Sequence, residues 1–379
     1  MRIGRIDQKD GTDLRITIVH CFETHEDRVD MLCKVLRADG HAVTVVCSDW
    51  NHFRKCTRTE FKPGSVPVHA KPYRKNLSLA RILSHRRFAE DAIRAAEKTA
   101  PDLLWVFSPP NFLIKYAALF KQKCPDVKLI LDFIDIWPET MPIRRFKNTL
   151  PFRMWKDLRD RYANVADLVV AECDLFRVPL EKTVPAEKIS TLYFGRDLPE
   201  IQTGLMPPED RIALCYLGSI NNIVDIDRIA WIIENLPLPV KLHIIGGGER
   251  EEELVRAAAC AGAEVVRHGN VYDPLEKQKI FDSCHFGLNT LKDTVFIGVT
   301  MKSVDYFAGG LPILNTLHGD TEEFVERYGI GINVRSAEDL KPEALRKAAE
   351  NRPAVRRFYE QYFSEEVFSK SMHDIINRL

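Results

Sequence analysis

The sequence predicts an α/β protein made of two doubly wound domains, each organised around a parallel sheet. The chain has 379 residues, more than one hydrophobic core usually holds. Short apolar runs alternate with helical patterns along most of its length, which is typical of βαβ units. Residues 197–210 interrupt this alternation and have the proline and glycine content of a linker. We therefore place a domain boundary near residue 195.

Composition indicates an ordinary globular protein. Hydrophobic residues make up 45% and charged residues 28% of the chain, and Lys plus Arg equals Asp plus Glu at 54 each. This balance does not favour nucleic acid as a partner. The nine cysteines have no CxxC or metal-ligand spacing, so we expect free thiols in a reducing compartment. No signal peptide or membrane-spanning run is recognisable, and we expect a cytoplasmic protein.

The first domain opens with a strand at Arg15–His20, a helical pattern and a second strand at 42–47. The turn after the first strand, residues 22–28, contains no glycine and is therefore not a dinucleotide-binding fingerprint. Asp27 and Arg28 stand in this turn, beyond the carboxyl end of a strand, where such sheets hold ligands. A helix-capping cluster is the alternative, because acids are common in a first helical turn.

The first domain continues with further strands and helices. Strands are expected at 103–107, 128–132 and 168–171, separated by helices near 111–123, 151–164 and 172–182. Asp135 follows one of these strands and is a candidate general base or acceptor-orienting group. Trp137, two residues on, offers a flat apolar face to a sugar. Packing in the core is the alternative for Trp137, because most aromatic side chains are buried.

Residues 52–87 form a strongly basic segment. They hold ten Lys or Arg and one acid, Glu60, with aromatic and aliphatic residues between them. Such a segment suits a lipid surface that carries anionic headgroups. Nucleic acid fits less well, because the rest of the chain is not basic. A solvated loop and helix is the alternative, since runs of charge are usually just solvated.

The second domain begins with two strands that end in glycines. Ile212–Leu217 is followed by Gly218 and Ser219, and Val240–Ile245 is followed by the triplet 246–248. The carboxyl ends of neighbouring parallel strands meet at one edge of a sheet. We therefore expect these glycines at a ligand-binding edge.

Residues 297–315 predict a loop, a short helix, a glycine stop and a buried strand. Thr300 or Ser303 can cap the helix, whose free N–H groups suit a phosphate. Lys302 adds a full positive charge there. Asp305, three residues further and therefore close to Lys302 on the surface, can accept hydrogen bonds from a sugar diol. A surface helix with one incidental ion pair is the alternative.

The C-terminal residues 353–379 carry apolar side chains at helical spacing and need a surface to pack on. We expect these helices to pack back toward the first domain. The expected organisation is therefore a first domain at 1–195, a second domain at 196–352 and a helical tail at 353–379.

Several segments resemble GT-B glycosyltransferases. These are IIGGGE at 244–249, GNVYD at 269–273 and AGGLPILN at 308–315, within a similarity that spans nearly the whole chain from about residue 15. Residues 216–227 and 298–315 are similar to bacterial galactofuranosyltransferase-like enzymes of capsule and O-antigen synthesis. The resemblance implies two Rossmann-like domains facing a central cleft, with the nucleotide sugar in the second domain and the acceptor in the first.

The resemblance also implies roles for individual residues. The donor diphosphate would lie at the helix start, and the donor-binding positions are Thr300, Met301, Lys302, Ser303, Gly218, Ser219, Gly246 and Gly247. Backbone groups at Val271 and Tyr272 would hold the base, and Asp305 stands where relatives have a glutamate that binds the ribose. The candidate catalytic and acceptor-orienting residues are Asp135, Lys302, Asp27 and Arg28.

The sequence departs from the family pattern in three places. The turn at 219–222 lacks the Arg and Lys that grip the diphosphate in many relatives, and we expect Lys302 to replace the lost charge. Ile297 stands where relatives have a second glutamate. The first strand is not followed by a glycine-rich loop.

The sequence therefore predicts a glycosyltransferase that uses a nucleotide sugar, with UDP as the expected nucleotide and no obligatory metal. The expected acceptor is a carbohydrate, with a lipid-linked glycan as one form, in surface polysaccharide synthesis at the inner face of the membrane. A sugar-nucleotide epimerase of the same architecture is one alternative. An inactive protein that binds a sugar nucleotide is another.

Overall fold

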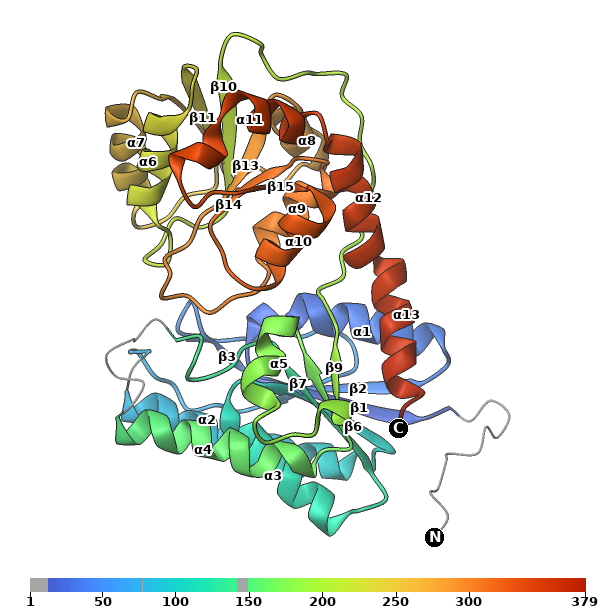
Figure 1. The fold of residues 1–379 in the computed structure, drawn as a ribbon. Helices are drawn as coiled ribbons and strands as arrows, with labels where there is room; N and C mark the ends of the chain where they lie inside the picture. Colours follow the sequence, from blue (N-terminus) through green and yellow to red (C-terminus); the bar gives the residue numbers. More distant parts are fainter. Residues whose placement is uncertain (1–12, 77, 142–148) are drawn as a thin grey trace. The chain divides into compact units, whose positions relative to one another are not determined.

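The computed structural model describes residues 13–76, 78–141 and 149–379, and the chain forms two compact units (Figure 1). Unit 1 contains the chain up to Gly195 together with Phe368–Leu379, and unit 2 is Arg196–Val367. This division corrects the expectation for the helical tail. Residues 353–367 belong to unit 2, and only the end of the chain returns to unit 1.

Unit 1 is built on a seven-stranded parallel sheet of order β5-β2-β1-β6-β7-β8-β9. Its strands are β1 (Arg15–His20), β2 (Ala42–Ser48), β5 (Ser65–Val68), β6 (Leu103–Ser108), β7 (Lys128–Phe133), β8 (Leu168–Ala171) and β9 (Ile189–Thr191). A short antiparallel pair, β3 (Trp50–Asn51) and β4 (Cys56–Thr57), lies outside this sheet. The sequence did not predict β5 and β9. The proline in β5 is tolerated because β5 is an edge strand, which does not need every backbone donor.

The helices of unit 1 cover both faces of its sheet. They are α1 (Glu26–Ala38), α2 (Leu79–Lys98), α3 (Asn111–Lys123), α4 (Leu150–Tyr162), α5 (Asp174–Leu180) and the end of α13 (Glu365–Ile376). In Figure 1, α2, α3 and α4 lie on one face, and α1 and the end of α13 lie on the other. Gly195 permits this packing of α13, because a Cβ at that position would lie 2.5 Å from the Cβ of Phe368.

Unit 2 is built on a six-stranded parallel sheet of order β12-β11-β10-β13-β14-β15. Its strands are β10 (Ile212–Leu217), β11 (Val240–Ile245), β12 (Glu264–Gly269), β13 (Phe286–Asn289), β14 (Ile313–Asn315) and β15 (Gly331–Asn333). Its helices are α6 (Ile226–Asn235), α7 (Glu251–Cys260), α8 (Pro274–Asp282), α9 (Met301–Ala308), α10 (Asp320–Tyr328), α11 (Pro342–Ala349) and α12 (Arg352–Tyr362). Phe358 of α12 is buried and contacts Phe307 of α9 edge-on, which holds α12 in this unit.

The strand order places the ligand-binding edge of each sheet. In unit 1 the order reverses between β1 and β6, and in unit 2 it reverses between β10 and β13. Doubly wound sheets bind ligands beyond the carboxyl ends of their strands at this point. In unit 2, the turn after β10 and the loop that leads from β13 to α9 therefore flank the expected site.

Two other expectations concern the whole chain. All nine cysteines are free thiols, as predicted, and six of them are buried. Across the ranges that the structure describes, no helix combines the length and the apolar character needed to cross a bilayer.

Candidate functional site

The amino end of α9 has the cap that the sequence predicts. The Thr300 hydroxyl accepts from the Ser303 N–H (3.2 Å), and the Ser303 hydroxyl accepts from the Thr300 N–H (3.3 Å). This reciprocal capping box fixes the first turn. The N–H groups of Met301 and Lys302 precede the first bonds of the helix and point out of its end, so they can bind an anion.

Lys302 is a partly buried cation at this helix end. Its Nζ lies 4.6 Å from the centre of the Tyr216 ring. Burial lowers the pKa of the Lys302 ammonium from 10.5 to about 7. Among the described residues, no carboxylate lies within ion-pair distance of Lys302, so no described counter-charge offsets the loss of hydration of its charged form.

Asp305 pairs with two other cations and not with Lys302. Nη1 of Arg196 donates to its carboxylate at 2.6 Å, and Nζ of Lys277 lies 3.6 Å away. The incidental ion pair between Lys302 and Asp305 is therefore absent. Asp305 is already held by two cations, and its assignment to a ribose remains a prediction.

Tyr216 joins Lys302 to the turn after β10, a role that the sequence analysis missed. The side chain is 1% exposed, and its hydroxyl donates to the Ser219 carbonyl at 3.0 Å. The ring lies beneath the Lys302 ammonium and the hydroxyl holds the turn, so one side chain sets the position of both. The signal in the sequence was an aromatic residue just before the Leu-Gly-Ser turn.

Tyr306 fixes α9 to the sheet. Its hydroxyl donates to the Cys215 carbonyl (3.0 Å) and accepts from the Leu217 N–H (2.7 Å). Gly287 makes room for the ring, because a Cβ there would lie 2.6 Å from it. The amino end of α9 is therefore held at the edge of the sheet beside the end of β10.

The glycines after β10 and β11 have different roles. Gly218 has a φ of +109°, and no atom would lie within 4 Å of a Cβ at this position, so its outer face is open to a ligand. Gly246 has a φ of +115°, and a Cβ there would lie 2.3 Å from the Gly218 carbonyl oxygen. Gly247 accepts from the Ile220 N–H at 2.9 Å. Gly246 and Gly247 thus support the Gly218 turn through close packing.

Val271 and Tyr272 line a pocket of about 550 Å³ beyond the end of β12. Tyr272 is 87% exposed. The rings of His243 and His268, in the same pocket, stack with centroids 5.2 Å apart. The pocket offers flat surfaces and backbone groups, which suits a nucleobase, and the base-binding role of Val271 and Tyr272 remains a prediction.

In unit 1, Arg28 is part of the core, which contradicts the expectation that it contacts an acceptor. Its guanidinium is 1% exposed, donates to the fully buried carboxylate of Asp132 through Nε and Nη2 (both 3.1 Å), and donates to the Leu192 carbonyl (2.8 Å). These hydrogen bonds therefore hold the Arg28 guanidinium to other groups of the protein itself. Asp27, by contrast, is exposed in the first turn of α1.

Asp135 and Trp137 are joined by a hydrogen bond. The indole N–H donates to the Asp135 carboxylate at 2.7 Å, and burial raises the pKa of that carboxyl. Trp137 itself is 8% exposed and packs against Arg81 and Trp155. The core interpretation of Trp137 is therefore correct, and its flat face is not available to a sugar.

Glu172 is a second acid at this edge of unit 1 that the sequence analysis missed. It follows the end of β8, and burial raises its pKa to about 8. A carboxyl with such a pKa can hold or accept a proton near neutral pH. Its signal was an acid directly after the apolar strand LVVA, similar to Asp135, which lies two residues beyond the end of β7.

Several cations of the basic segment have partners within unit 1. Arg58 pairs with Glu26 (2.6 Å), Arg87 pairs with Asp91 (2.8 Å), and Lys62 pairs with Asp30. Arg81 is 6% exposed. This pairing reduces the positive charge available to a membrane, and the membrane contact remains a prediction.

The chain contains one Asp-x-Asp sequence, Asp225-Ile226-Asp227. Asp225 caps α6 by accepting from the Arg228 N–H (3.0 Å), and Asp227 is exposed in the first turn. Within the described parts of the chain, no three His, Cys, Asp or Glu side chains lie close enough together to hold a metal ion.

Each unit matches a family model. Residues 26–199 match the model described as Glycosyltransferase Family 4, and residues 211–351 match the one described as Glycosyl transferases group 1. A search of the curated proteins found no match to the chain.

Solved structures share the fold over nearly the whole chain. The sucrose-phosphate synthase of Thermosynechococcus elongatus is 13% identical, with a TM-score of 0.69 and coverage of 96% of this chain and 98% of that one. HepE of Anabaena, in complex with UDP and glucose, is 14% identical, with a TM-score of 0.67 and coverage of 97% and 100%. The lipopolysaccharide outer core galactosyltransferase WaaB is also 14% identical, with a TM-score of 0.67 and coverage of 96% and 99%.

Proposed function

The chain is a glycosyltransferase of the GT-B type, and from this premise we propose that it moves a sugar from a UDP-sugar, held at the start of α9, to a carbohydrate acceptor. The single observation that carries this proposal is Lys302. It is a partly buried ammonium without a carboxylate partner among the described residues, and it stands at a helix end whose N–H groups point outward. A diphosphate supplies the negative charge that this arrangement lacks.

Lys302 would act on the leaving group. When the bond between the sugar and the diphosphate breaks, negative charge grows on a phosphate oxygen. An ammonium and two N–H groups already in position stabilise that charge without reorganisation, and loss of one such contact typically costs about 10²–10³ in rate. The open face of Gly218 lets the diphosphate approach the turn that Tyr216 holds. This chemistry needs no metal ion, and we propose a metal-independent transfer.

The acceptor hydroxyl must lose a proton during the transfer. We assign this step to the carboxylates at the edge of the unit 1 sheet, Asp135 or Glu172, because burial raises the pKa of both. The acceptor we propose is a glycan of surface polysaccharide synthesis. A lipid-linked glycan at the inner face of the membrane would bring the basic segment 52–87 close to anionic headgroups.

The test measures UDP release from a panel of UDP-sugars, with and without a glycan extract, for the wild type and for Lys302→Met. We expect the variant to lose activity about 10²–10³-fold while its thermal midpoint stays the same or rises. Lys347→Met is the matched control, because Lys347 is an exposed lysine of α11 in the same unit, and it should keep full activity.

Each other outcome contradicts the proposal. Full activity in Lys302→Met rules out the diphosphate site. Turnover of a UDP-sugar into a new sugar nucleotide without any acceptor indicates an epimerase. Tight nucleotide binding without transfer to any glycan indicates an inactive binding protein.

A further inference from the structure

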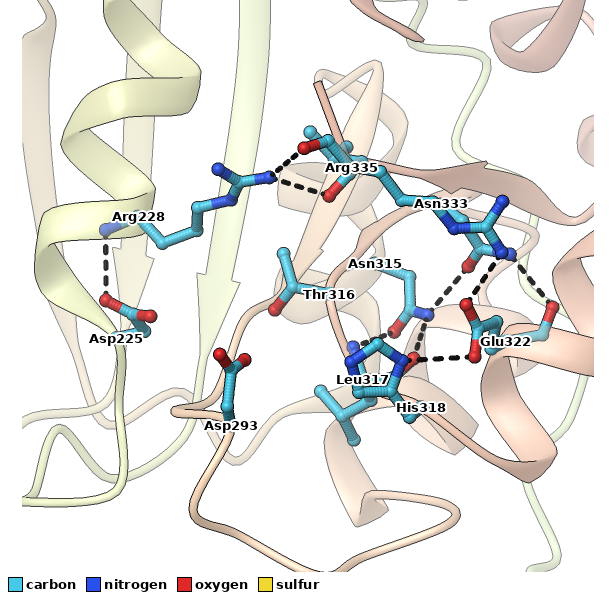
Figure 2. A pocket seen from close by; sticks show the side chains of 11 residues that line it. Asp225, Arg228, Asp293, Asn315, Thr316, Leu317, His318, Glu322, Asn333 and Arg335 are labelled. Atoms are coloured by element: carbon cyan, nitrogen blue, oxygen red, sulfur yellow. Dashed lines mark hydrogen bonds and ion pairs between the residues drawn. The ribbon is translucent and has the colours of Figure 1, made fainter. Parts of the chain in front are cut away.

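Unit 2 contains a second polar pocket, of about 420 Å³, at the carboxyl ends of β14 and β15 and the start of α6 (Figure 2). This volume is within the usual range of small-molecule sites, about 300–1,000 Å³. None of the residues assigned above to the nucleotide lines it. The pocket therefore needs an explanation of its own.

Two of the carboxylates that line the pocket, Asp225 and Asp293, form no ion pair with a described residue. Asp225, at the start of α6, uses one oxygen to cap the helix. Asp293 lies in the loop after β13 and is exposed. Across the described ranges, neither forms an ion pair, and Figure 2 shows both on the same side of the pocket. Their unpaired oxygens can accept hydrogen bonds.

Arg228 supplies donors in the same pocket. Its Nη2 donates to the Val334 carbonyl (2.9 Å) and the Arg335 carbonyl (3.1 Å), and its Cζ lies 4.1 Å from the centre of the Trp231 ring. These contacts fix the guanidinium. Its other N–H groups take no part in these two bonds, so the pocket combines fixed donors with carboxylate acceptors.

Thr316 adds an unpaired hydroxyl to the pocket. Its Oγ1 is screened from solvent and has no hydrogen-bond partner in the described structure. A buried hydroxyl without a partner is unfavourable, and in native proteins it usually marks a water or ligand position. A rotation of the Thr316 side chain about χ1 would turn this hydroxyl toward a ligand in the pocket, where it would gain a partner.

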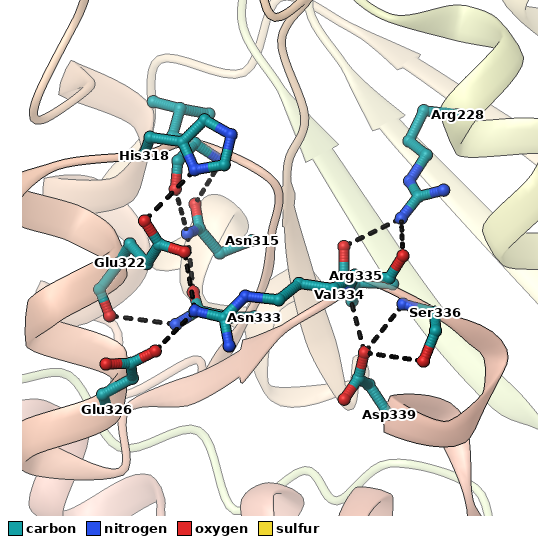
Figure 3. Close-up of polar contacts among 11 residues, drawn as sticks. Arg228, Asn315, His318, Glu322, Glu326, Asn333, Val334, Arg335, Ser336 and Asp339 are labelled. Carbon is teal, nitrogen blue, oxygen red and sulfur yellow. Dashed lines mark hydrogen bonds and ion pairs between the residues drawn. The ribbon is translucent and has the colours of Figure 1, made fainter.

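The floor of the pocket is rigid and fully bonded. The side-chain amides of Asn315 and Asn333 are joined (2.8 Å), and Asn315 also donates to the Leu317 carbonyl (2.8 Å) (Figure 3). Arg335 is held by Glu322 (2.7 Å) and by Glu326. These groups shape the pocket, while Asp225, Asp293, Arg228 and Thr316 are left to bind a ligand.

We propose that this pocket binds a neutral, hydroxyl-rich ligand, namely one saccharide unit. A sugar hydroxyl can donate to a carboxylate and accept from a guanidinium at the same time, which is the combination found here. Two unpaired carboxylates oppose an anionic ligand. The proposal does not depend on the nucleotide site, because the two sets of residues are separate.

The test uses saturation-transfer NMR and calorimetric titration of the full chain with glucose, galactose, mannose, N-acetylglucosamine and lactose. We expect at least one of these saccharides to bind the wild type at millimolar concentration. Asp293→Asn should bind it roughly tenfold more weakly, because it loses a charge-assisted hydrogen bond. Asp227→Asn is the matched control, since Asp227 lies on the same helix as Asp225 but outside the pocket, and it should bind normally.

The variant Thr316→Val distinguishes a loss of saccharide binding from a loss of folding stability. Valine has nearly the same shape and removes the unpaired hydroxyl, so the thermal midpoint should hold or rise while saccharide binding weakens. Lys302→Met should bind the saccharide normally, which distinguishes this pocket from the nucleotide site. The proposal is overturned if no saccharide binds, or if Asp293→Asn and Thr316→Val both bind as the wild type does. A thermal shift with Ca²⁺ or Mg²⁺ alone that Asp293→Asn abolishes would also overturn it.

Discussion

Asn289 and Asn315 stand opposite each other in register at the carboxyl ends of β13 and β14, and the Asn289 amide donates to the Asn315 amide oxygen at 3.0 Å. Asn289 also accepts from the Thr300 hydroxyl at 2.8 Å. The same row continues to Asn333 on β15. A buried chain of amides therefore connects the cap of α9 to the floor of the second pocket.

This chain predicts the effect of Asn289→Ala. The substitution removes an acceptor from the part-buried Thr300 hydroxyl and a donor from the buried Asn315, and should lower the stability of unit 2 by about 1–3 kcal/mol. Nucleotide affinity should also fall, because the Thr300 hydroxyl loses its orientation. Denaturant titration and calorimetry measure both effects. An unchanged denaturation midpoint would show that the amide chain contributes nothing to stability.

The lowered pKa of Lys302 predicts that the protein takes up a proton when a nucleotide sugar binds. Its pKa is about 7 in the free protein, and a bound diphosphate raises it by stabilising the charged form. Above pH 7 the free amine is mostly neutral, so binding takes up close to one proton. Affinity should then fall about tenfold per pH unit as the pH rises above 7.

Titrations with a UDP-sugar in buffers of different ionisation enthalpy measure this uptake at pH 8. Lys302→Met should show none, whereas Lys347→Met should match the wild type. Equal uptake in Lys302→Met would assign the proton to another group.

Arg28 predicts a loss of stability rather than a change in acceptor affinity. Arg28→Met leaves Asp132 charged, buried and without its ion-pair partner, which typically costs about 3–5 kcal/mol. Replacing both residues with leucine removes the stranded charge and should restore much of the loss. Thermal unfolding of the single and double variants tests this. A fully stable Arg28→Met would contradict the core assignment.

The close approach of Gly246 to the Gly218 backbone predicts that tight packing of the two holds the turn after β10 in place. In Gly246→Ala, the new methyl group would lie 2.3 Å from the Gly218 carbonyl oxygen, in addition to the strain of a positive φ. Gly262→Ala is the control, because Gly262 has a φ of +93° but nothing within 4 Å. The control carries strain alone, about 1–3 kcal/mol. Gly246→Ala should lower the thermal midpoint clearly more, and equal shifts would contradict this account.

Glu172 predicts a pH dependence of stability. Its pKa is about 8 in the folded protein against an ordinary value of 4.5, so the folded state binds the extra proton between these values. The contribution is fully present below pH 4.5 and is lost as the pH rises through 8. Glu172→Gln should therefore flatten the fall in thermal midpoint between pH 5 and pH 9. An identical profile for the variant and the wild type would contradict the raised pKa.

The sequence alone determined the features that depend on nearby residues. Predominantly apolar runs of strand length predicted β1, β8, β10 and β11 with their observed bounds, because strands of a parallel sheet that is covered by helices are rich in apolar residues. The cap of α9 followed from Thr300 and Ser303, which are three residues apart. At its other end, Gly310 has a φ of +65° and the Leu311 N–H donates to the Tyr306 carbonyl, as expected of a glycine stop.

Only the tertiary structure decided which distant residues meet. Arg196 reaches Asp305 across 109 residues, and Arg28 reaches Asp132 across 104. The first pair replaces the ion pair between Lys302 and Asp305 that local spacing allowed, and the second places Arg28 in the core. The lysine over Tyr216 and the asparagine row depend on strand order and register, which bring side chains together regardless of their separation in the chain. Spacing along the chain defines a helix or its cap, whereas the partner of a charge depends on which elements pack beside it.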